Sequence, residues 1–377
     1  METHPENELE KSRNRIDLID SRLIDLLAER QAEVEKVIEF KKLNNMPVRH
    51  PAREEDMISG RRAMGMEKGL DPDYIEELFR TILRQSRVEQ TESKSEKGVK
   101  PEATILIVGG TGGMGRYFAE WFIRSGYETR VLGSRDWDNA EALCEGIDLA
   151  LISVPIDKTV DAIEKISPYI PDNAVLADLT SIKKTPMASM LRSYGGPVIG
   201  IHPLFGPSTS TMDKQIVVFT PGRNTEACKW IIDQLADWGA VIVKSDEDEH
   251  DRIMAVVQAL RHFATFTFGR FLFRKNIDLF RSLEFSSPIY RLELGMVGRL
   301  FAQAPALYSG IIFASEERRE ILKEFISSMS ETMEIVNKGD KDEFEKQFNE
   351  IVEWFGPFSE QAMRESSFLI DKLIERF

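Results

Sequence analysis

The stretch ATILIVGGTGGMGRYFAEWF, residues 103–122, decides the fold class of this chain. An apolar, β-branched run is followed by a glycine-rich turn and then by a helix-like segment. Gly110, Gly112 and Gly115 have the spacing G-x-G-x-x-G, in which the glycines allow a tight turn, close approach of the backbone to a pyrophosphate, and close helix–strand packing. The N-terminus of the helix offers N–H groups to phosphates. The stretch therefore predicts a dinucleotide-binding turn.

The same alternation of strand and helix continues beyond this turn. Short apolar runs separated by helix-like stretches predict a mostly parallel, doubly wound sheet. These runs are ATILIVGG, ETRVLG, LALISVPI, AVLADLTS, PVIGIH, QIVVFT and AVIVKS. We therefore expect a Rossmann-like domain over residues 104–246.

The end of the second strand bears on the choice of cofactor. An acidic residue at this position binds the ribose 2′-hydroxyl of NAD, whereas a small residue with a nearby arginine suits the 2′-phosphate of NADP. Here Gly133 takes the position, Ser134 and Arg135 follow, and Asp136 is close by. The residues expected at the dinucleotide are Gly110, Gly112, Gly113, Met114, Gly115, Ser134 and Arg135.

His202 is one of only five histidines and ends the apolar run of VIGIHPLFGP. A structural role in the turn before Pro203 is one interpretation. The alternative is catalytic, because open α/β sheets bind ligands at the carboxyl ends of their strands. We favour a general base that removes a hydroxyl proton while hydride leaves for a nicotinamide.

Residues 8–90 have apolar positions at helical spacing and predict an all-helical segment. The first helix, about residues 9–44, would be roughly 50 Å long, too long for one small domain to bury, so we expect an intertwined dimer. Arg30 and Lys41 share a face of this helix, as Ser86 and Gln90 do on the last one. The polar segment 91–103, which contains Pro101, predicts a linker.

Composition excludes several classes of protein. A net charge of −14 argues against a nucleic-acid-binding surface, and no apolar stretch is long enough to span a membrane. Cys144 and Cys228 match no metal or redox spacing. We therefore expect a cytoplasmic protein without a metal site. Separately, the helical pattern of apolar residues returns after the last predicted strand, so we expect residues 247–377 to be helical.

Five stretches together resemble the bifunctional chorismate mutase/prephenate dehydrogenase family of tyrosine biosynthesis. They are IVGGTGGMGR, DLTSIK, GIHPLFGP, EHDRIMAVVQALRHFATF and SSPIYRLELGMVGRLFAQ. The resemblance covers essentially the whole chain. It implies a helical mutase domain over residues 1–92, a linker at 93–103, the Rossmann-like domain at 104–246, and a helical substrate-binding and dimerisation domain at 247–377.

For the mutase, the resemblance implies a site that holds chorismate with its enolpyruvyl arm over the ring and stabilises charge on the ether oxygen. Lys41 and Gln90 would donate to that oxygen, and Arg13 would come from the other protomer. His50 lies where some helical mutases carry an acid. The other residues implied at the substrate are Arg30, Arg53, Glu54 and Ser86.

For the dehydrogenase, the resemblance implies oxidative decarboxylation of prephenate to 4-hydroxyphenylpyruvate. His202 would accept the hydroxyl proton, Ser181 would meet that hydroxyl or His202, and Arg299 would bind the ring carboxylate. Further contacts or supports would be Lys183, His262 and Arg291.

The resemblance also implies NAD as cofactor, a homodimer, and inhibition by tyrosine. Gly133 departs from the acidic residue that members of this family generally carry, so NADP stays open as the second cofactor. Two alternatives remain from the sequence: a β-hydroxyacid-type dehydrogenase with an unrelated helical appendage, and an inactive sensor of aromatic metabolites.

Overall fold

The computed structural model describes residues 5–43, 51–94 and 98–374 and divides into two compact units. The first unit holds the N-terminal helices and most of the sheet domain. The second comprises residues 154–163, 180–189 and 245–377. No helix in the described ranges is long and apolar enough to cross a membrane.

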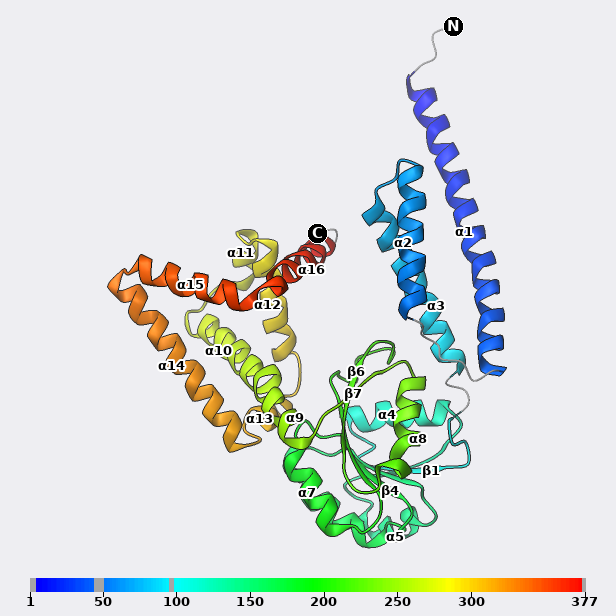
Figure 1. The fold of residues 1–377 in the computed structure, drawn as a ribbon, viewed down its shortest axis with the longest axis vertical. Coiled ribbons are helices and arrows are strands. Elements are labelled where there is room, and N and C mark those ends of the chain that lie inside the picture. The colour runs from blue at the N-terminus through cyan, green and yellow to red at the C-terminus, as the bar shows by residue number, and fades with distance from the viewer. Residues whose placement is uncertain (1–4, 44–50, 95–97, 375–377) are drawn as a thin grey trace. The chain divides into compact units, whose positions relative to one another are not determined.

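Three helices form the N-terminal segment (Figure 1): α1 (Pro5–Leu43), α2 (Pro51–Glu67) and α3 (Pro72–Lys94). At 1.5 Å per residue, the 39 residues of α1 span about 58 Å. Helix α3 packs against both α1 and α2. It runs four residues further than expected, because the segment Thr91–Lys94 contains neither proline nor glycine and continues the helix.

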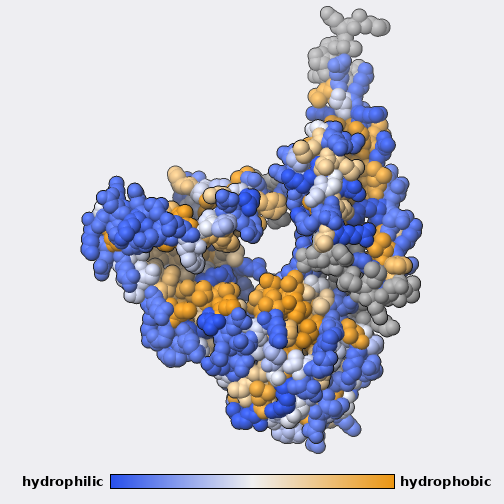
Figure 2. Space-filling model, in the orientation of Figure 1, coloured by the Kyte–Doolittle hydropathy of each residue, from blue (hydrophilic) through white to orange (hydrophobic). Residues whose placement is uncertain are grey.

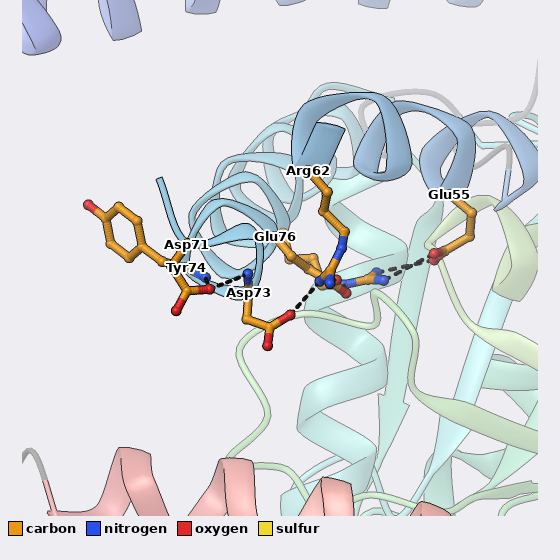
Figure 3. A network of polar contacts seen from close by, with 7 residues as sticks. Glu55, Arg62, Asp71, Asp73, Tyr74 and Glu76 are labelled. Carbon is orange, nitrogen blue, oxygen red and sulfur yellow. Dashed lines mark hydrogen bonds and ion pairs between the residues drawn. The ribbon is translucent and has the colours of Figure 1, made fainter. Parts of the chain in front are cut away.

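Ion pairs join α2 to α3 on one side of this segment (Figure 3). Arg62 of α2 contacts Asp73 and Glu76 at the start of α3. Arg80 of α3 reaches back to Glu55 at 3.0 Å. Because these pairs connect residues of both helices, they fix the register of α2 on α3.

A seven-stranded sheet forms the centre of the segment that follows the N-terminal helices. Its strands are β1 (Thr104–Val108), β2 (Glu128–Leu132), β3 (Leu149–Ile152), β4 (Val175–Asp178), β5 (Val198–Pro203), β6 (Ile216–Pro221) and β7 (Val241–Lys244). The order is β2-β1-β3-β4-β5-β6-β7, and every neighbouring pair is parallel except β5 with β6. The predicted mostly parallel, doubly wound sheet is confirmed.

Helices connect the strands along the chain. They are α4 (Gly113–Arg124), α5 (Ala140–Cys144), α6 (Thr159–Ile166), α7 (Lys184–Ser193) and α8 (Lys229–Asp237). Side chains from α4 and α8 pack on the face of the sheet that carries Ile107, Leu151 and Ile199. Since side chains alternate along a strand, Gly200 and His202 belong to the opposite face.

The second unit is helical, as predicted for the C-terminal region. Its helices after residue 245 are α9 (Glu247–Met254), a π-helical segment (Ala255–Leu260), α10 (Arg261–Arg274), α11 (Leu279–Glu284), α12 (Pro288–Phe301), α13 (Pro305–Ile312), α14 (Glu316–Lys338), α15 (Lys341–Phe355) and α16 (Pro357–Ile374). Side-chain caps from Asp246, Ser287 and Ser315 fix the starts of α9, α12 and α14.

Candidate active sites

The glycine-rich turn between β1 and α4 has the geometry that a dinucleotide cradle requires. Gly109 adopts a φ of +87°. A Cβ on Gly110 would lie 2.7 Å from Val131 Cγ1, and one on Gly115 would lie 2.4 Å from the Gly109 carbonyl oxygen. Both positions therefore require glycine for close packing of strand and helix. The residues present fit a dinucleotide.

The phosphate-facing residues expected from the sequence lie together at the start of α4. Gly112 is exposed with an extended backbone, and Gly113, Met114 and Gly115 form the first turn of the helix. The N–H groups of a first helical turn have no partner within the helix, so they are available to an anion. Ser134 and Arg135 are exposed on the turn that follows β2.

His202 lies at the carboxyl edge of the same sheet. The strand register places Val108, Ile152, Asp178 and Gly200 in one row, and His202 is two residues beyond that row. The loop after His202 also approaches the glycine-rich turn. A Cβ on Gly113 would lie 3.1 Å from Pro207 Cγ, and the Phe205 ring stands 5.7 Å from the Tyr117 ring of α4.

Asp178 is a residue near His202 that sequence reasoning did not single out. It pairs with Gly200 across β4 and β5, so Asp178 and His202 belong to the same face of neighbouring strands. Both side chains are buried, at 0% and 2% exposure. The signal was present in the sequence, because an acidic residue ends the apolar run AVLAD just as His202 ends VIGIH.

In the second unit, the segment that carries Ser181 and Lys183 is held by two long-range contacts. Asp251 Oδ1 and Oδ2 accept hydrogen bonds from the backbone N–H groups of Lys183, at 2.7 Å, and Lys184, at 3.0 Å. Arg318 donates to the Ser181 carbonyl oxygen at 2.9 Å. Sequence reasoning identified Ser181 and Lys183 but neither of their partners.

The Asp251 carboxylate also contacts a buried histidine. Its Oδ1 lies 2.7 Å from His250 Nδ1, and the His250 side chain is 1% exposed. Burial raises the pKa of Asp251, but the bonds from His250 and the two backbone N–H groups outweigh it and lower that pKa overall. Asp251 therefore stays ionised while it holds the Ser181–Lys183 segment.

We expect Arg318→Met to destabilise the second unit. The Arg318 side chain is 1% exposed and also donates to the Ile311 carbonyl oxygen at 2.6 Å. Methionine has a similar length but leaves two carbonyl groups without this donor, at a cost of about 2–5 kcal/mol in the free energy of unfolding. Denaturant titration measures the loss. The neighbouring variant Arg319→Met, at an exposed residue paired with Glu316, is the matched control, and equal effects from both would contradict this reading.

The remaining predicted dehydrogenase residues lie on α10 and α12 of the second unit. Burial, followed by the charges of Arg261 and Arg318, lowers the pKa of His262 to about 4, so its ring is neutral at pH 7. Its ring packs edge-on against Tyr308 at 4.8 Å. Arg291 donates to the Leu283 carbonyl oxygen at 3.0 Å, whereas Arg299 is exposed in the single chain.

Two of the predicted mutase residues are in direct contact. Arg30 Nη1 of α1 donates to Ser86 Oγ of α3 at 2.7 Å, and Ser86 is 4% exposed. Burial lowers the pKa of Arg30, with a smaller opposing effect from Glu89. Lys41 is half-buried, further along the same helix. The structure thus brings Arg30 and Ser86 to one place on facing helices.

The other predicted mutase residues are more dispersed. Arg13 is exposed near the N-terminal end of α1, and Arg53 is exposed at the start of α2. Glu54 accepts a hydrogen bond at 3.1 Å from Arg87, a buried arginine that the sequence analysis missed. The side chain of Gln90 and the whole of His50 lie outside the described residues.

No metal site accompanies these groups in the described ranges. There, no cluster of three or more histidine, cysteine, aspartate or glutamate side chains has the arrangement to hold a metal ion.

Comparison with known families covers all three segments. The family described as chorismate mutase type II matches residues 12–91. The nucleotide-binding domain of prephenate dehydrogenase matches residues 127–244, and its dimerization domain matches residues 246–350. The T-protein of Enterobacter agglomerans is 41% identical over 367 residues, which cover 96% of this chain and 97% of that protein. The chain belongs to the T-protein family.

Two further comparisons agree with this family. The T-protein of Haemophilus influenzae is 38% identical and covers 97% of both chains. The crystal structure of Aquifex aeolicus prephenate dehydrogenase with hydroxyphenyl propionate and NAD+ matches with a TM-score of 0.55 at 19% identity, over 66% of this chain and 96% of that one. The latter shows the shared fold of the dehydrogenase part.

Like other members of the T-protein family, the chain combines a chorismate mutase with a prephenate dehydrogenase of tyrosine biosynthesis. The N-terminal helices are a mutase domain in their own right, which removes the alternative of an unrelated helical appendage. The dehydrogenase part uses a nicotinamide dinucleotide, NAD or NADP. The predicted fold class, with a helical mutase domain, a Rossmann-like sheet and a helical C-terminal domain, is confirmed.

Proposed function

We propose that His202 is the general base of the dehydrogenase reaction. The supporting observation is that His202 and the glycine-rich turn occupy the same carboxyl edge of the sheet. His202 accepts the proton of the prephenate ring hydroxyl, and buried Asp178 on the neighbouring strand orients the imidazole. When bound, the nicotinamide accepts hydride from the carbon that bears this hydroxyl. Loss of CO2 from the ring is favourable because it produces an aromatic ring.

We assign the remaining dehydrogenase contacts to residues of the second unit. Arg299 binds the ring carboxylate of prephenate through its guanidinium group, and Ser181 donates to the substrate hydroxyl or to His202. Lys183, His262 and Arg291 support the substrate. His262 does so as a neutral hydrogen-bonding group, because its pKa of about 4 leaves it uncharged at pH 7.

The substrate test for this proposal compares prephenate with simple 3-hydroxyacids in the presence of NAD+ or NADP+. Arg299 is proposed to bind the carboxylate of the prephenate ring, which a simple 3-hydroxyacid lacks, so we expect reduced cofactor only with prephenate. Spectrophotometric rates at matched substrate concentrations measure the difference. Comparable turnover of a 3-hydroxyacid would contradict the proposed role of Arg299 in binding the ring carboxylate.

For the mutase, we propose that Arg30, Lys41 and Arg53 bind the carboxylates and ether oxygen of chorismate. The contact between Arg30 and Ser86 supports a preorganised site on the facing helices α1 and α3. Gln90 would join Lys41 at the ether oxygen. Glu54 forms an ion pair with Arg87. The positive charge of Arg87 offsets the negative charge of Glu54, which would otherwise repel the dianionic substrate.

We further propose that the chain works as a homodimer. Apolar side chains are exposed along α1 (Figure 2); Leu9, Ile16, Ile19, Leu23, Leu26 and Leu27 are 46–58% exposed. In the second unit, α10 and α12 border an open apolar groove of about 720 Å³ whose lining includes Phe266, Leu272, Val297 and Phe301. Large exposed apolar surfaces mark interfaces, and a second copy would cover both.

A shared mutase site predicts complementation between two inactive variants. Each site would combine Arg13 of one protomer with Lys41 of the other. We expect Arg13→Met and Lys41→Gln homodimers to be nearly inactive, and a mixture refolded together to regain about a quarter of wild-type mutase activity, because half the dimers are mixed and one of their two sites is intact. Activity of the mixture no higher than that of the separate variants would rule out sharing of Arg13.

Three further expectations belong to this proposal. Tyrosine would inhibit by competing in the prephenate pocket, since its ring resembles that of the product. A cytoplasmic location suits the two cysteines, which are both buried and not joined in a disulfide. The functional divisions would fall at residues 1–92, 93–103, 104–246 and 247–377.

A further inference from the structure

Residue 133, just after β2, takes the position that usually decides between NAD and NADP. Gly133 is the first residue after β2, where dinucleotide-binding folds commonly carry the acid that binds the ribose 2′-hydroxyl. From the sequence alone, Gly133 followed by Ser134 and Arg135 favours a 2′-phosphate. The structure shows that a carboxylate nevertheless lies at this position.

That carboxylate belongs to Asp136. The turn after β2 is closed by a hydrogen bond from Asp136 N to the Gly133 carbonyl oxygen, at 3.2 Å. In the same turn, Gly133 N donates to Asp136 Oδ2 at 2.9 Å. These two reciprocal bonds fold the Asp136 side chain back onto residue 133.

The space beside Gly133 connects this carboxylate to the glycine-rich turn. A Cβ built on Gly133 would lie 2.7 Å from Asp136 Oδ2 and 3.5 Å from Thr111 Cγ2. Thr111 is the middle residue of Gly110-Thr111-Gly112, the part of the turn expected to approach the dinucleotide. The Asp136 carboxylate therefore stands where the side chain of an acidic residue 133 would begin, next to the nucleotide cradle.

We propose that Asp136 replaces the missing acid at position 133 and selects NAD over NADP. The inference rests on the proposed dehydrogenase function. One lone pair of Oδ2 is used by Gly133 N–H, and Oδ1 with the remaining lone pairs accepts hydrogen bonds from ribose hydroxyls. A 2′-phosphate at the same place would bring two negative charges together, which the exposed Arg135 would have to offset.

The test measures dissociation constants of the full-length protein for NAD+ and NADP+ by calorimetry. We expect wild type to bind NAD+ at least about tenfold more tightly than NADP+, and Asp136→Asn to shift that ratio toward NADP+ by about 10- to 100-fold. Asparagine keeps the size of the side chain and an oxygen that can accept from Gly133 N–H, so the turn is retained while the charge is lost. Asp138→Asn, at an exposed acid two residues further on, makes the same charge change and should leave the ratio unchanged.

A second pair of variants separates selectivity from folding. Asp136→Ala should lose the preference for NAD+, and adding Gly133→Asp to it should restore the preference, because the space beside residue 133 is then free of the Asp136 carboxylate. A wild-type preference for NADP+, or an unchanged ratio in Asp136→Asn with both dinucleotides bound, would overturn this assignment alone. Failure of wild type to bind either dinucleotide would overturn the dehydrogenase proposal and the assignment with it.

Discussion

His202→Asn should lower the rate of prephenate oxidation by about 10²- to 10⁴-fold, the range expected when a general base is removed. Asparagine preserves much of the shape of imidazole but cannot take up the hydroxyl proton. His202 is 2% exposed at the carboxyl edge of the sheet, so no bulk water replaces it directly. Initial rates of NADH formation with saturating prephenate measure the loss.

The mutase activity of the same preparation is the control for His202→Asn. The proposed mutase residues lie on α1, α2 and α3, and His202 lies on β5. We therefore expect chorismate rearrangement and NAD+ binding to remain at wild-type levels. If mutase and dehydrogenase rates fell by the same factor, the substitution would be acting through folding or assembly, and the role of His202 as base would be contradicted.

Lys41→Gln should reduce the mutase rate by about 10²- to 10³-fold, because it removes a preorganised positive charge beside an oxygen that gains negative charge in the transition state. The rearrangement involves no acid, base or nucleophile, so positioning and charge stabilisation supply its acceleration. Glutamine keeps a hydrogen-bond donor but removes the positive charge. The rate of chorismate loss measures the effect.

Lys36→Gln is the matched control for this prediction. Lys36 lies on the same helix, is 68% exposed, and pairs with Glu33. We expect it to leave mutase activity unchanged, and we expect Lys41→Gln to oxidise added prephenate normally. Equal loss of mutase activity in Lys36→Gln and Lys41→Gln would instead indicate a general effect of charge on α1.

The elements of the fold were predictable because their signals are local. Each of the seven strands lies in a short run rich in apolar or β-branched residues. The glycine-rich turn has a spacing set by steric contact, as the 2.4 Å approach of a Cβ on Gly115 to the Gly109 carbonyl oxygen demonstrates. The end of α3 was less predictable. A polar sequence such as Thr91–Lys94 is compatible with either linker or helix, and nothing local stops the helix there.

Long-range partners left no pattern in the sequence. Arg318 supports Ser181 across 137 positions, and Asp251 holds Lys183 across 68, so neither pair could be matched without the structure. The contact of Asp136 with Gly133 is local in the sequence, but it depends on how the turn folds and was not predictable either. The sequence showed a glycine at the cofactor-selecting position, but only the turn geometry shows that a carboxylate three residues later returns to it.

One chain converts chorismate to prephenate and then oxidises prephenate to 4-hydroxyphenylpyruvate. The most direct measurement incubates the purified full-length protein with chorismate and NAD+, and follows chorismate, prephenate, 4-hydroxyphenylpyruvate and NADH in the same sample. We expect chorismate to disappear, prephenate to appear transiently, and NADH to form in equal amount to 4-hydroxyphenylpyruvate. Accumulation of prephenate without reduced cofactor, with NAD+ and with NADP+ alike, would contradict the joining of these two reactions in one chain.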